Sequence, residues 1–151
     1  MSSFDLVPVT DNEGLEICKA IRRRVFIEEQ GVEEKLELDE HDCIGSHCRH
    51  YYAADKGMPV GAFRLTDKGG GVAKLQRFCV LREYRGRGIG RFMLLCLEDL
   101  CRENGFTVIE MGAQCRAAPF YAKCGYTVVS DVFMDASIEH VKMEKRLSSG
   151  V

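Results

Sequence analysis

The sequence predicts an α+β fold, formed as a single domain over residues 1–151 with helices packed on a mixed central β-sheet. Strand-like runs occur in groups, so the expected order is β-α-β-β-β-α-β-α-β-β and not a strict alternation. The length is that of one ordinary domain, and no repeat or low-complexity linker interrupts it. We therefore expect a sheet of about six to seven strands flanked by helices.

The first half of the chain combines a strand, a helix and three further strands. A strand is expected at residues 4–9, after which Thr10 or Asp11 offers a helix N-cap. Apolar residues then recur at helical spacing up to about Gln30, and Gly31 ends the helix. An acidic, irregular stretch follows. The pattern then predicts strands at residues 50–54, 60–66 and 72–81.

The second half begins with a helical pattern after Gly90, which ends near Asn104. A β-prone apolar run follows, and a short helix begins at about Pro119 because proline is tolerated in a first turn. The remaining residues read as strands. The three strands expected in this half are residues 106–113, 126–133 and 139–147.

The composition argues against several classes of protein. A formal charge of −2 and a pI near 6.1 are unusual for a nucleic-acid-binding domain, which carries a basic face. No apolar run approaches the ~20 residues that cross a bilayer, and the N-terminus lacks the pattern of a secretory signal. Six of the eight cysteines fall singly in expected helices and strands, which indicates thiols in a reducing compartment. We expect a cytoplasmic protein without nucleic-acid or membrane partners.

One group of soft ligands could in principle bind zinc. Its members are His41, Cys43, His47, Cys48 and His50. Four residues separate the two cysteines, which is not a usual zinc-finger spacing, and no second pair follows. In a strand, His47 and Cys48 would also face opposite sides. We therefore expect no metal.

The segment Arg85–Gly90, RGRGIG, lies where an expected strand ends and a helix begins. Glycines let a ligand approach the backbone, and the free amides of a first helical turn attract anions. Arg91 stands where the third glycine of a dinucleotide loop would be, and the Walker A string is absent. These residues alone leave two interpretations open: an anion site, or a tight turn that only starts a helix.

Residues 75–90, LQRFCVLREYRGRGIG, contain this loop and most of the expected strand before it. This segment resembles motif A of the GNAT superfamily of N-acetyltransferases, whose core is [Q/R]-x-x-G-x-[G/A]. Residues 118–126, APFYAKCGY, are similar to its F-Y-x-K-x-G-[F/Y] stretch. Four further segments are similar to the small ElaA-like branch of this superfamily. They are RRVFIEEQGV at residues 23–32, DEHD at residues 39–42, GAQ at residues 112–114 and EHVKM at residues 139–143. The likeness covers essentially the whole chain.

The resemblance implies a GNAT fold, in which two central strands splay apart and admit acetyl-CoA. Here these strands would be residues 72–81 and 107–113. It also implies an acetyl-CoA-dependent N-acetyltransferase that transfers acetyl directly to a primary amine. A non-catalytic acyl-CoA-binding regulatory module is the alternative. The cofactor-binding residues carried over are Phe78, Cys79, Val80, Arg85, Gly86, Arg87, Gly88, Ile89, Gly90 and Phe120.

Tyr121 matches the tyrosine that commonly protonates the departing CoA thiolate in this family. A phenol, with a pKa of about 10, suits that role, although a packed aromatic would leave the same pattern. The general base is less defined, because Lys74 occupies the position at which the histone-modifying relatives carry glutamate. The candidates are Glu29, Asp39, His41, Glu110 and a relayed water.

Charge is segregated along the chain. Residues 28–42 contain eight carboxylates, whereas residues 77–91 contain five arginines. The acidic segment is either an anionic rim for a cationic amine or a solvated loop.

Four residues are candidates for contact with the acceptor. We expect Glu29 and His41 to face the substrate, with Arg77 and Gln114 available for an acidic group on it. The acceptor is an amine of a small molecule or of a protein. We also expect that the C-terminal strands could form a homodimer.

Overall fold

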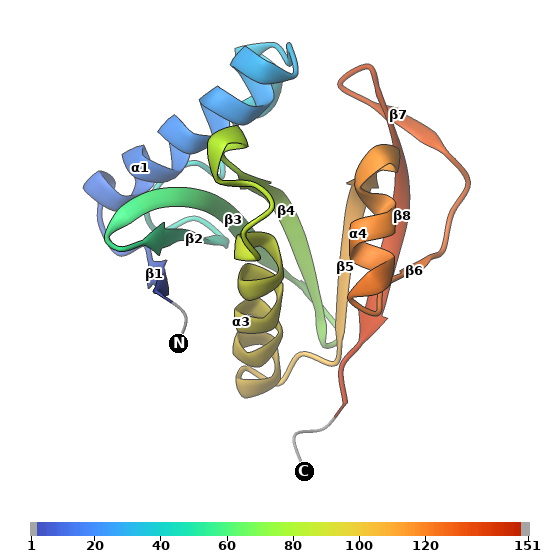
Figure 1. Cartoon of the computed structure of the whole chain (residues 1–151). Coiled ribbons are helices and arrows are strands. Elements are labelled where there is room, and N and C mark those ends of the chain that lie inside the picture. The colour runs from blue at the N-terminus through green and yellow to red at the C-terminus, as the bar shows by residue number, and fades with distance from the viewer. Residues whose placement is uncertain (1–2, 149–151) are drawn as a thin grey trace.

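The computed structural model describes residues 3–148 and contains one eight-stranded sheet (Figure 1). In sheet order the strands are β1 (Phe4–Pro8), β2 (Cys48–Asp55), β3 (Met58–Gly69), β4 (Val72–Val80), β5 (Val108–Gln114), β8 (Ile138–Arg146) and β6 (Thr127–Val128), while β7 (Phe133–Asp135) also pairs with β8. The β4–β5 pair is parallel and the other pairs are antiparallel. The predicted α+β fold with a mixed sheet is confirmed.

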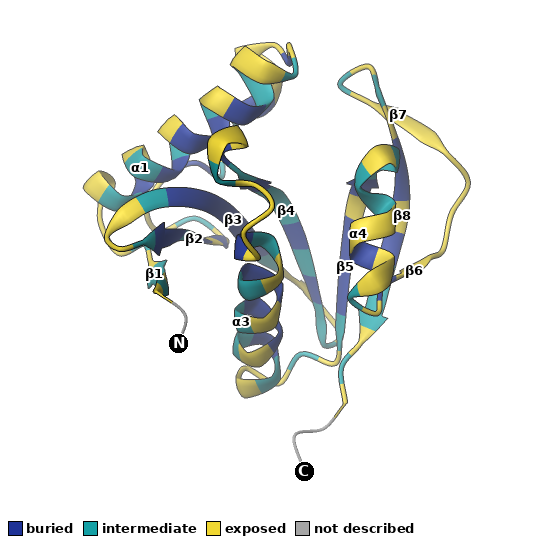
Figure 2. Cartoon of the chain, viewed as in Figure 1, coloured by how far each residue is buried: buried dark blue, intermediate teal, exposed yellow. Residues whose placement is uncertain are grey.

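Helices cover both faces of the sheet (Figure 2). The helices are α1 (Asn12–Arg22), α2 (Glu34–Glu37), α3 (Ile89–Glu103) and α4 (Ala118–Lys123), with short 3₁₀ turns η2 (Arg82–Tyr84) and η3 (Cys115–Ala117). The apolar face of α3 packs on the sheet at β1 and β4, in one buried cluster with Leu75, Ile109 and Met143. Cys18 and Ile21 of α1 pack in a second core cluster. Within residues 3–148, no helix is long and apolar enough to cross a bilayer.

The first helix has the predicted extent but changes its winding. Asp11 is its N-cap, because the Asp11 carboxylate accepts a hydrogen bond from the Gly14 amide at 2.9 Å. After α1 the chain continues as a π-helix, η1 (Arg23–Glu29), and Gly31 follows with φ of +75°. π-Helical turns are rare and frequently occur at functional sites. Here η1 supplies one wall of the cavity described below.

The strand predicted for residues 126–133 is wrong. The chain forms two short strands, β6 and β7, because the Ser130 hydroxyl accepts a hydrogen bond from the Lys142 amide at 2.8 Å. This side chain takes the place of a backbone partner and interrupts the ladder on β8. The arm around this interruption exposes apolar side chains, namely Val128, Val129, Val132, Phe133 and Met134. The homodimer expected through the C-terminal strands stays a prediction.

A buried ion cluster organises the acidic segment. Arg22 is 1% exposed, and its guanidinium lies 2.7 Å from the Glu37 carboxylate and 2.5 Å from that of Asp42. Arg64, also 1% exposed, contacts Asp42 at 3.2 Å and Asp39 at 2.7 Å. For these three carboxylates, both hypotheses are wrong: they form neither an anionic rim nor a solvated loop. They fasten the loop to α1 and β3.

Arg22→Ala should lower the free energy of unfolding by about 3–5 kcal/mol, because it removes the guanidinium that lies closest to two buried carboxylates, Glu37 and Asp42. Arg24→Ala is the matched control. Arg24 pairs with Glu83 in solvent at 2.5 Å, and its removal should cost at most about 1 kcal/mol. Urea denaturation followed by circular dichroism measures both variants. Equal losses would contradict a stabilising role for the cluster.

Candidate active site

The two central strands pair over four residues and then part (Figure 1). Their parallel register runs from Val72 beside Val108 to Leu75 beside Met111. Beyond that point β4 remains paired with β3, and β5 with β8, but the facing edges of β4 and β5 no longer bond to each other. The predicted splayed strands are therefore present. A ligand backbone could take the free hydrogen-bonding positions on the opened edge of β4.

A β-bulge at Arg77 lies just after the parting. Gln76 pairs with Arg64 and Cys79 pairs with Ala62, so two β4 residues oppose one β3 residue. Arg77 has a left-handed φ of +57°, which is costly for a residue with a side chain. Its guanidinium donates to the backbone carbonyl of Glu37 at 3.1 Å and lies 3.2 Å from the Glu37 carboxylate. These contacts hold the bulge against α2.

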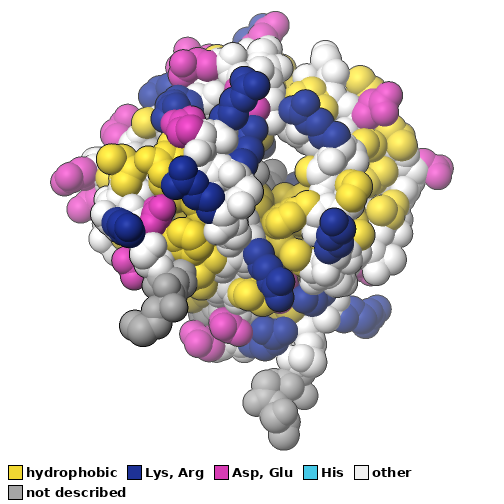
Figure 3. Space-filling view, in the orientation of Figure 1, with side chains coloured by type: hydrophobic (Ala, Val, Ile, Leu, Met, Phe, Trp, Pro, Cys, Tyr) yellow, Lys and Arg dark blue, Asp and Glu magenta, His cyan; other side chains and the backbone are white. Residues whose placement is uncertain are grey.

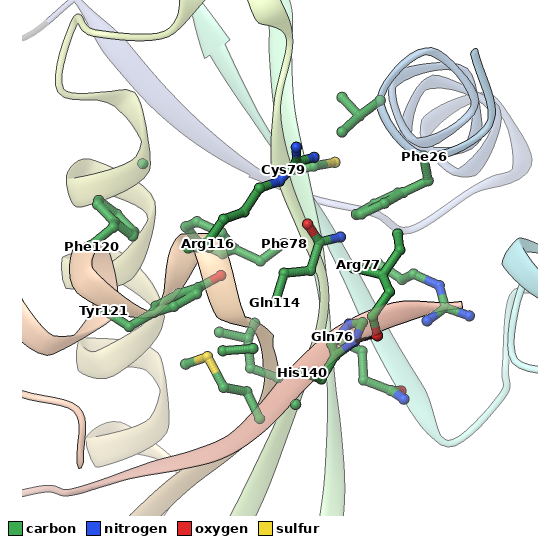
Figure 4. Close-up of a pocket in the computed structure, with 18 of the residues that line it drawn as sticks. Phe26, Gln76, Arg77, Phe78, Cys79, Gln114, Arg116, Phe120, Tyr121 and His140 are labelled. Carbon is green, nitrogen blue, oxygen red and sulfur yellow. Dashed lines mark hydrogen bonds between the residues drawn. The ribbon is translucent and has the colours of Figure 1, made fainter. Parts of the chain in front are cut away.

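A cavity of about 1120 Å³ occupies the gap between the parted strands. It extends from η1 and α2 on one side to α4 and β7 on the other. Figure 3 shows a hollow at this position with several Lys and Arg side chains around it. The close-up in Figure 4 shows that side chains from β4, β5, β8, η1 and α4 converge on it.

The turn before α3 forms one end of the cavity. Gly86 and Gly88 have φ of +80° and +83°, and the space beside each is open. Gly88 is the N-cap residue of α3 and has no side chain, so it offers no side-chain acceptor to the first amides of α3. Gly90 leaves room for the Phe120 ring, since a Cβ there would lie 3.1 Å from that ring. The turn thus combines close backbone access with the positive end of a fifteen-residue helix.

The arginines of this region divide into paired and unpaired ones. Arg85 forms a two-point ion pair with Glu29, with both oxygen distances at 2.7 Å, and also donates to the Val80 carbonyl at 2.9 Å. Hydrogen bonding from Arg85 holds the pKa of Glu29 below its usual value. The Arg87 guanidinium lies over the Tyr84 ring. Arg91 and Arg116 line the cavity, and within the described chain neither has a carboxylate partner.

Tyr121 is buried in an aromatic cluster and borders the cavity. Its ring lies 5.8 Å from that of Phe78 and 5.2 Å from that of Phe120 in edge-to-face arrangements. Figure 4 shows the hydroxyl group pointing into the cavity. Burial raises the pKa of Tyr121 well above the usual value for a phenol. The hydroxyl is therefore protonated throughout the neutral range and faces the space between the strands.

Sequence comparison decides the family. The family model for the Acetyltransferase (GNAT) domain matches residues 9–147. The chain belongs to the GNAT acetyltransferase family. Among curated proteins it is similar to YyaT of Bacillus subtilis, with 39% identity over 143 residues that cover 95% of this chain and 96% of YyaT.

Solved structures agree with this assignment. A candidate N-acetyltransferase of Lactobacillus plantarum superposes with a TM-score of 0.89 and 27% identity, covering 97% of this chain and all of the other. Escherichia coli ElaA superposes with a TM-score of 0.81 and 21% identity, covering 96% and 99% of the two chains. The expected likeness to ElaA is thus confirmed at the level of the fold. The protein is an enzyme of the acetyltransferase class.

In this GNAT enzyme Phe78, Cys79 and Val80, the three β4 residues predicted by resemblance to bind the cofactor, differ in what they can offer to a ligand. The Phe78 ring packs against Phe63, Phe120 and Tyr121. The Cys79 side chain is buried toward α1, so Cys79 can offer only its backbone to the cavity. The Val80 carbonyl is already bonded to Arg85. The assignment of these residues and of the loop to the cofactor stays a prediction.

The proposed base and substrate residues are placed very differently. Asp39 and His41 do not line the cavity. Although burial acts to raise it, hydrogen bonds from Arg64 hold the pKa of Asp39 below its usual value. Glu110 does line the cavity, but hydrogen bonding from Lys68 lowers its pKa as well. Carboxylates with lowered pKa values bind a proton less readily, which disfavours them as bases near neutrality.

The two polar residues expected on the substrate side both border the cavity but already have partners. The Gln114 amide donates to the Gln30 side chain at 2.7 Å, which ties β5 to η1. Arg77 is held by α2, as described above. Each can still offer its remaining donors to a ligand.

His140 is a cavity residue to which the sequence assigned no role. It lies beside Gln114 in the β5–β8 register, and its ring stacks on Phe133 with a centroid distance of 5.8 Å. Its Nδ1 lies 2.7 Å from the Ile138 carbonyl oxygen, which can only accept, so Nδ1 carries a proton. In the neutral ring Nε2 is then the acceptor. Strand alternation could have placed His140 on the same face as Lys142.

The possible zinc ligands do not form a site. Within residues 3–148, no three His, Cys, Asp or Glu side chains are placed to hold a metal ion. The Cys48 thiol instead lies 2.8 Å from the Thr66 hydroxyl, and His50 Nε2 lies 2.9 Å from the His41 carbonyl oxygen.

Gly88→Asp should weaken coenzyme A binding at least about tenfold relative to Gly88→Asn, as measured by isothermal titration calorimetry. Both side chains have the same size and tolerate a left-handed backbone, so the pair isolates a negative charge placed beside the turn. Comparable affinity in the two folded variants would contradict phosphate binding at this turn.

Proposed function

We propose that this enzyme transfers the acetyl group of acetyl-CoA directly to a primary amine of a small molecule or a protein. The observation that carries the proposal is the single cavity that joins the open edge of β4, the glycine turn before α3 and the Tyr121 hydroxyl. An extended thioester ligand with an anionic end fits this combination of features.

The donor would be held by backbone groups more than by side chains. The amides of Arg85–Gly90 would bind the pyrophosphate, because they end in the first turn of α3 and the two glycines leave the backbone accessible. Arg91 and Arg116 would add charge. The pantetheine arm would lie along β4 at Phe78–Val80, where β5 no longer pairs. Phe120 would cover the arm from α4.

Tyr121 would assist the departure of the thiol. Attack of the amine nitrogen on the thioester carbon breaks the carbon–sulfur bond, and the sulfur leaves with the electron pair. The raised pKa of Tyr121 makes complete proton donation to a thiolate, with a pKa of about 8.5 for an ordinary thiol, unfavourable. The phenol would therefore act chiefly by donating a hydrogen bond to the sulfur as charge develops on it.

His140 would accept the proton of the amine. Of the carboxylates that line the cavity, Glu29, Glu37 and Glu110 are bound to arginines or lysines, and this lowers the pKa of Glu29 and Glu110. His140 has an Nε2 acceptor fixed by the bond from Nδ1 to Ile138. Directly or through one water, Nε2 would take the proton that the nitrogen loses on forming the amide bond.

A thiol-release assay with acetyl-CoA and a panel of amines tests the proposed function. Amine-dependent release of coenzyme A is expected. Tight binding of coenzyme A without release for any amine would support the alternative, a non-catalytic acyl-CoA-binding regulatory module. Release without an acetylated product would show hydrolysis only.

Tyr121→Phe should lower kcat about 10- to 100-fold while leaving coenzyme A affinity within about twofold, because it removes one hydrogen bond made to the developing thiolate. The variant retains the ring that packs on Phe78. Steady-state kinetics and calorimetry measure the two quantities. Tyr126→Phe is a control, since its hydroxyl bonds to buried Glu98 away from the cavity. Unchanged turnover in Tyr121→Phe would remove its proposed role.

His140→Gln should lower kcat about 10²-fold or more for strongly basic amines, because general-base catalysis contributes about 10²–10⁴-fold. The loss should be smaller for a weakly basic amine that is already unprotonated at the assay pH. Gln keeps a hydrogen-bonding side chain at this position of β8, so the variant changes proton transfer more than packing. Equal losses for both kinds of amine would indicate a structural role for His140.

A further inference from the structure

Three lysines surround one glutamate on the sheet face opposite α3, at the level where β4 and β5 are still paired. Lys74 and Glu110 are direct partners in the β4–β5 register. Lys68 reaches Glu110 from β3, and the Lys142 ammonium lies 3.2 Å from the other Glu110 oxygen from β8. All four side chains line the cavity. Lys68, Lys74, Lys142 and Glu110, here called the lysine cluster, form the floor of the half of the cavity that faces away from α3 and α4.

The charges in the lysine cluster do not balance. Lys68 and Lys142 share the single carboxylate of Glu110. Within residues 3–148, Lys74 has no ion pair at all, although it is partly buried. Three ammonium groups therefore face one carboxylate, which leaves an excess of about two positive charges on this wall of the cavity, where the Lys68 and Lys142 side chains are about half exposed.

The other carboxylates that line the cavity do not compensate this excess. Glu29 is bound to Arg85 on the side of the glycine turn. Glu37 is shared between two arginines. Asp135, which lies on exposed β7, is the remaining cavity carboxylate. A purely cationic acceptor would have to place its charge beside an already cationic floor.

We propose that the acceptor is an amine that also carries an anionic group, a carboxylate or a phosphate, and that Lys74 binds this group together with Lys68 and Lys142. This inference rests on the proposed amine acetylation and specifies its substrate class. The positive floor attracts the anion, and the amine then points along the cavity toward the parted strands. Lys74 is the specificity-determining residue, because it alone among the three has no carboxylate partner in the described chain.

The position of the cluster limits the size of the acceptor. Lys74 precedes Gln76, the first β4 residue beyond the parting, by two residues, or roughly 6.6 Å of extended strand. Along the strand, the backbone of Lys74 and the opened edge are therefore close enough for one small acceptor to approach both. A small amino acid or a short phosphorylated amine spans this distance.

Matched pairs of acceptors test the proposal. Each pair keeps the amine and removes the anion: 4-aminobutyrate against 4-aminobutanamide, and phosphoethanolamine against ethanolamine. The expected result is a kcat/KM about 10- to 100-fold higher for the anionic member, the range of a charge-assisted hydrogen bond. The two pairs distinguish carboxylate from phosphate. Equal or higher kcat/KM for both neutral members would overturn the proposal while leaving the acetyltransferase function intact.

Lys74→Met should remove the preference, because methionine fills similar space without a charge. Lys56→Met is the matched control, since Lys56 is exposed in the β2–β3 turn and lies outside the cavity. It should keep the preference within about twofold. Coenzyme A affinity and melting temperature show whether each variant is folded. A preference retained in folded Lys74→Met would contradict the assignment of Lys74.

A binding measurement separates this inference from the proposed function. Calorimetry of the coenzyme A complex with phosphoethanolamine and with ethanolamine requires no turnover. Tighter binding of phosphoethanolamine by the wild type, lost in Lys74→Met, supports the anion site even if no amine is acetylated. Equal affinities for the two molecules, together with equal kcat/KM values, would refute it.

Discussion

The parting of β4 and β5 after Leu75 and Met111 is the constraint on which the rest of the molecule depends. Two parallel strands in the middle of a sheet would ordinarily remain paired, because each unpaired backbone group that loses water is costly. Here the bulge at Arg77 turns β4 away, and the contacts of Arg77 with α2 hold it there. The glycine turn, Tyr121 and His140 all face the space that this parting creates.

The buried arginines explain how such a costly arrangement persists. Arg77 is braced by Glu37, and Glu37 is itself held by Arg22 on α1. A second link runs from Arg22 through Asp42 to Arg64, which pairs with Gln76 next to the bulge. A buried ion pair alone is weak evidence for stability, but several shared partners fix relative positions. The ion cluster thus connects the first helix to the strand that opens the site.

The regular elements and the glycine turn could be predicted because their signals are local. Hydrophobic periodicity located α1 and α3, and two motifs at a fixed separation located the turn and Tyr121. The ion cluster could not be predicted, because Arg22 and Arg64 are brought to Asp42 only by the tertiary fold. The position of His41 also depends on the tertiary fold: we expect it near the substrate from the sequence, but it lies outside the cavity. The break between β6 and β7 depends on one hydroxyl, Ser130, whose partner is distant in sequence.

The electrostatics of the acceptor half follow from how its carboxylates are used. Hydrogen bonding to cations lowers the pKa of Glu29 and of Glu110. Burial raises the pKa of Glu37, but its carboxylate is already bound by Arg22 and Arg77. The same pairing that removes them as bases leaves the lysine cluster with unneutralised charge. In the proposed reaction His140 would take the proton, since its Nε2 is the acceptor of the neutral ring when Nδ1 is bonded to the Ile138 carbonyl. Within residues 3–148, the buried carboxylates that line the cavity are all bound to cations, and this bears both on which residue accepts the proton and on which charge the acceptor carries.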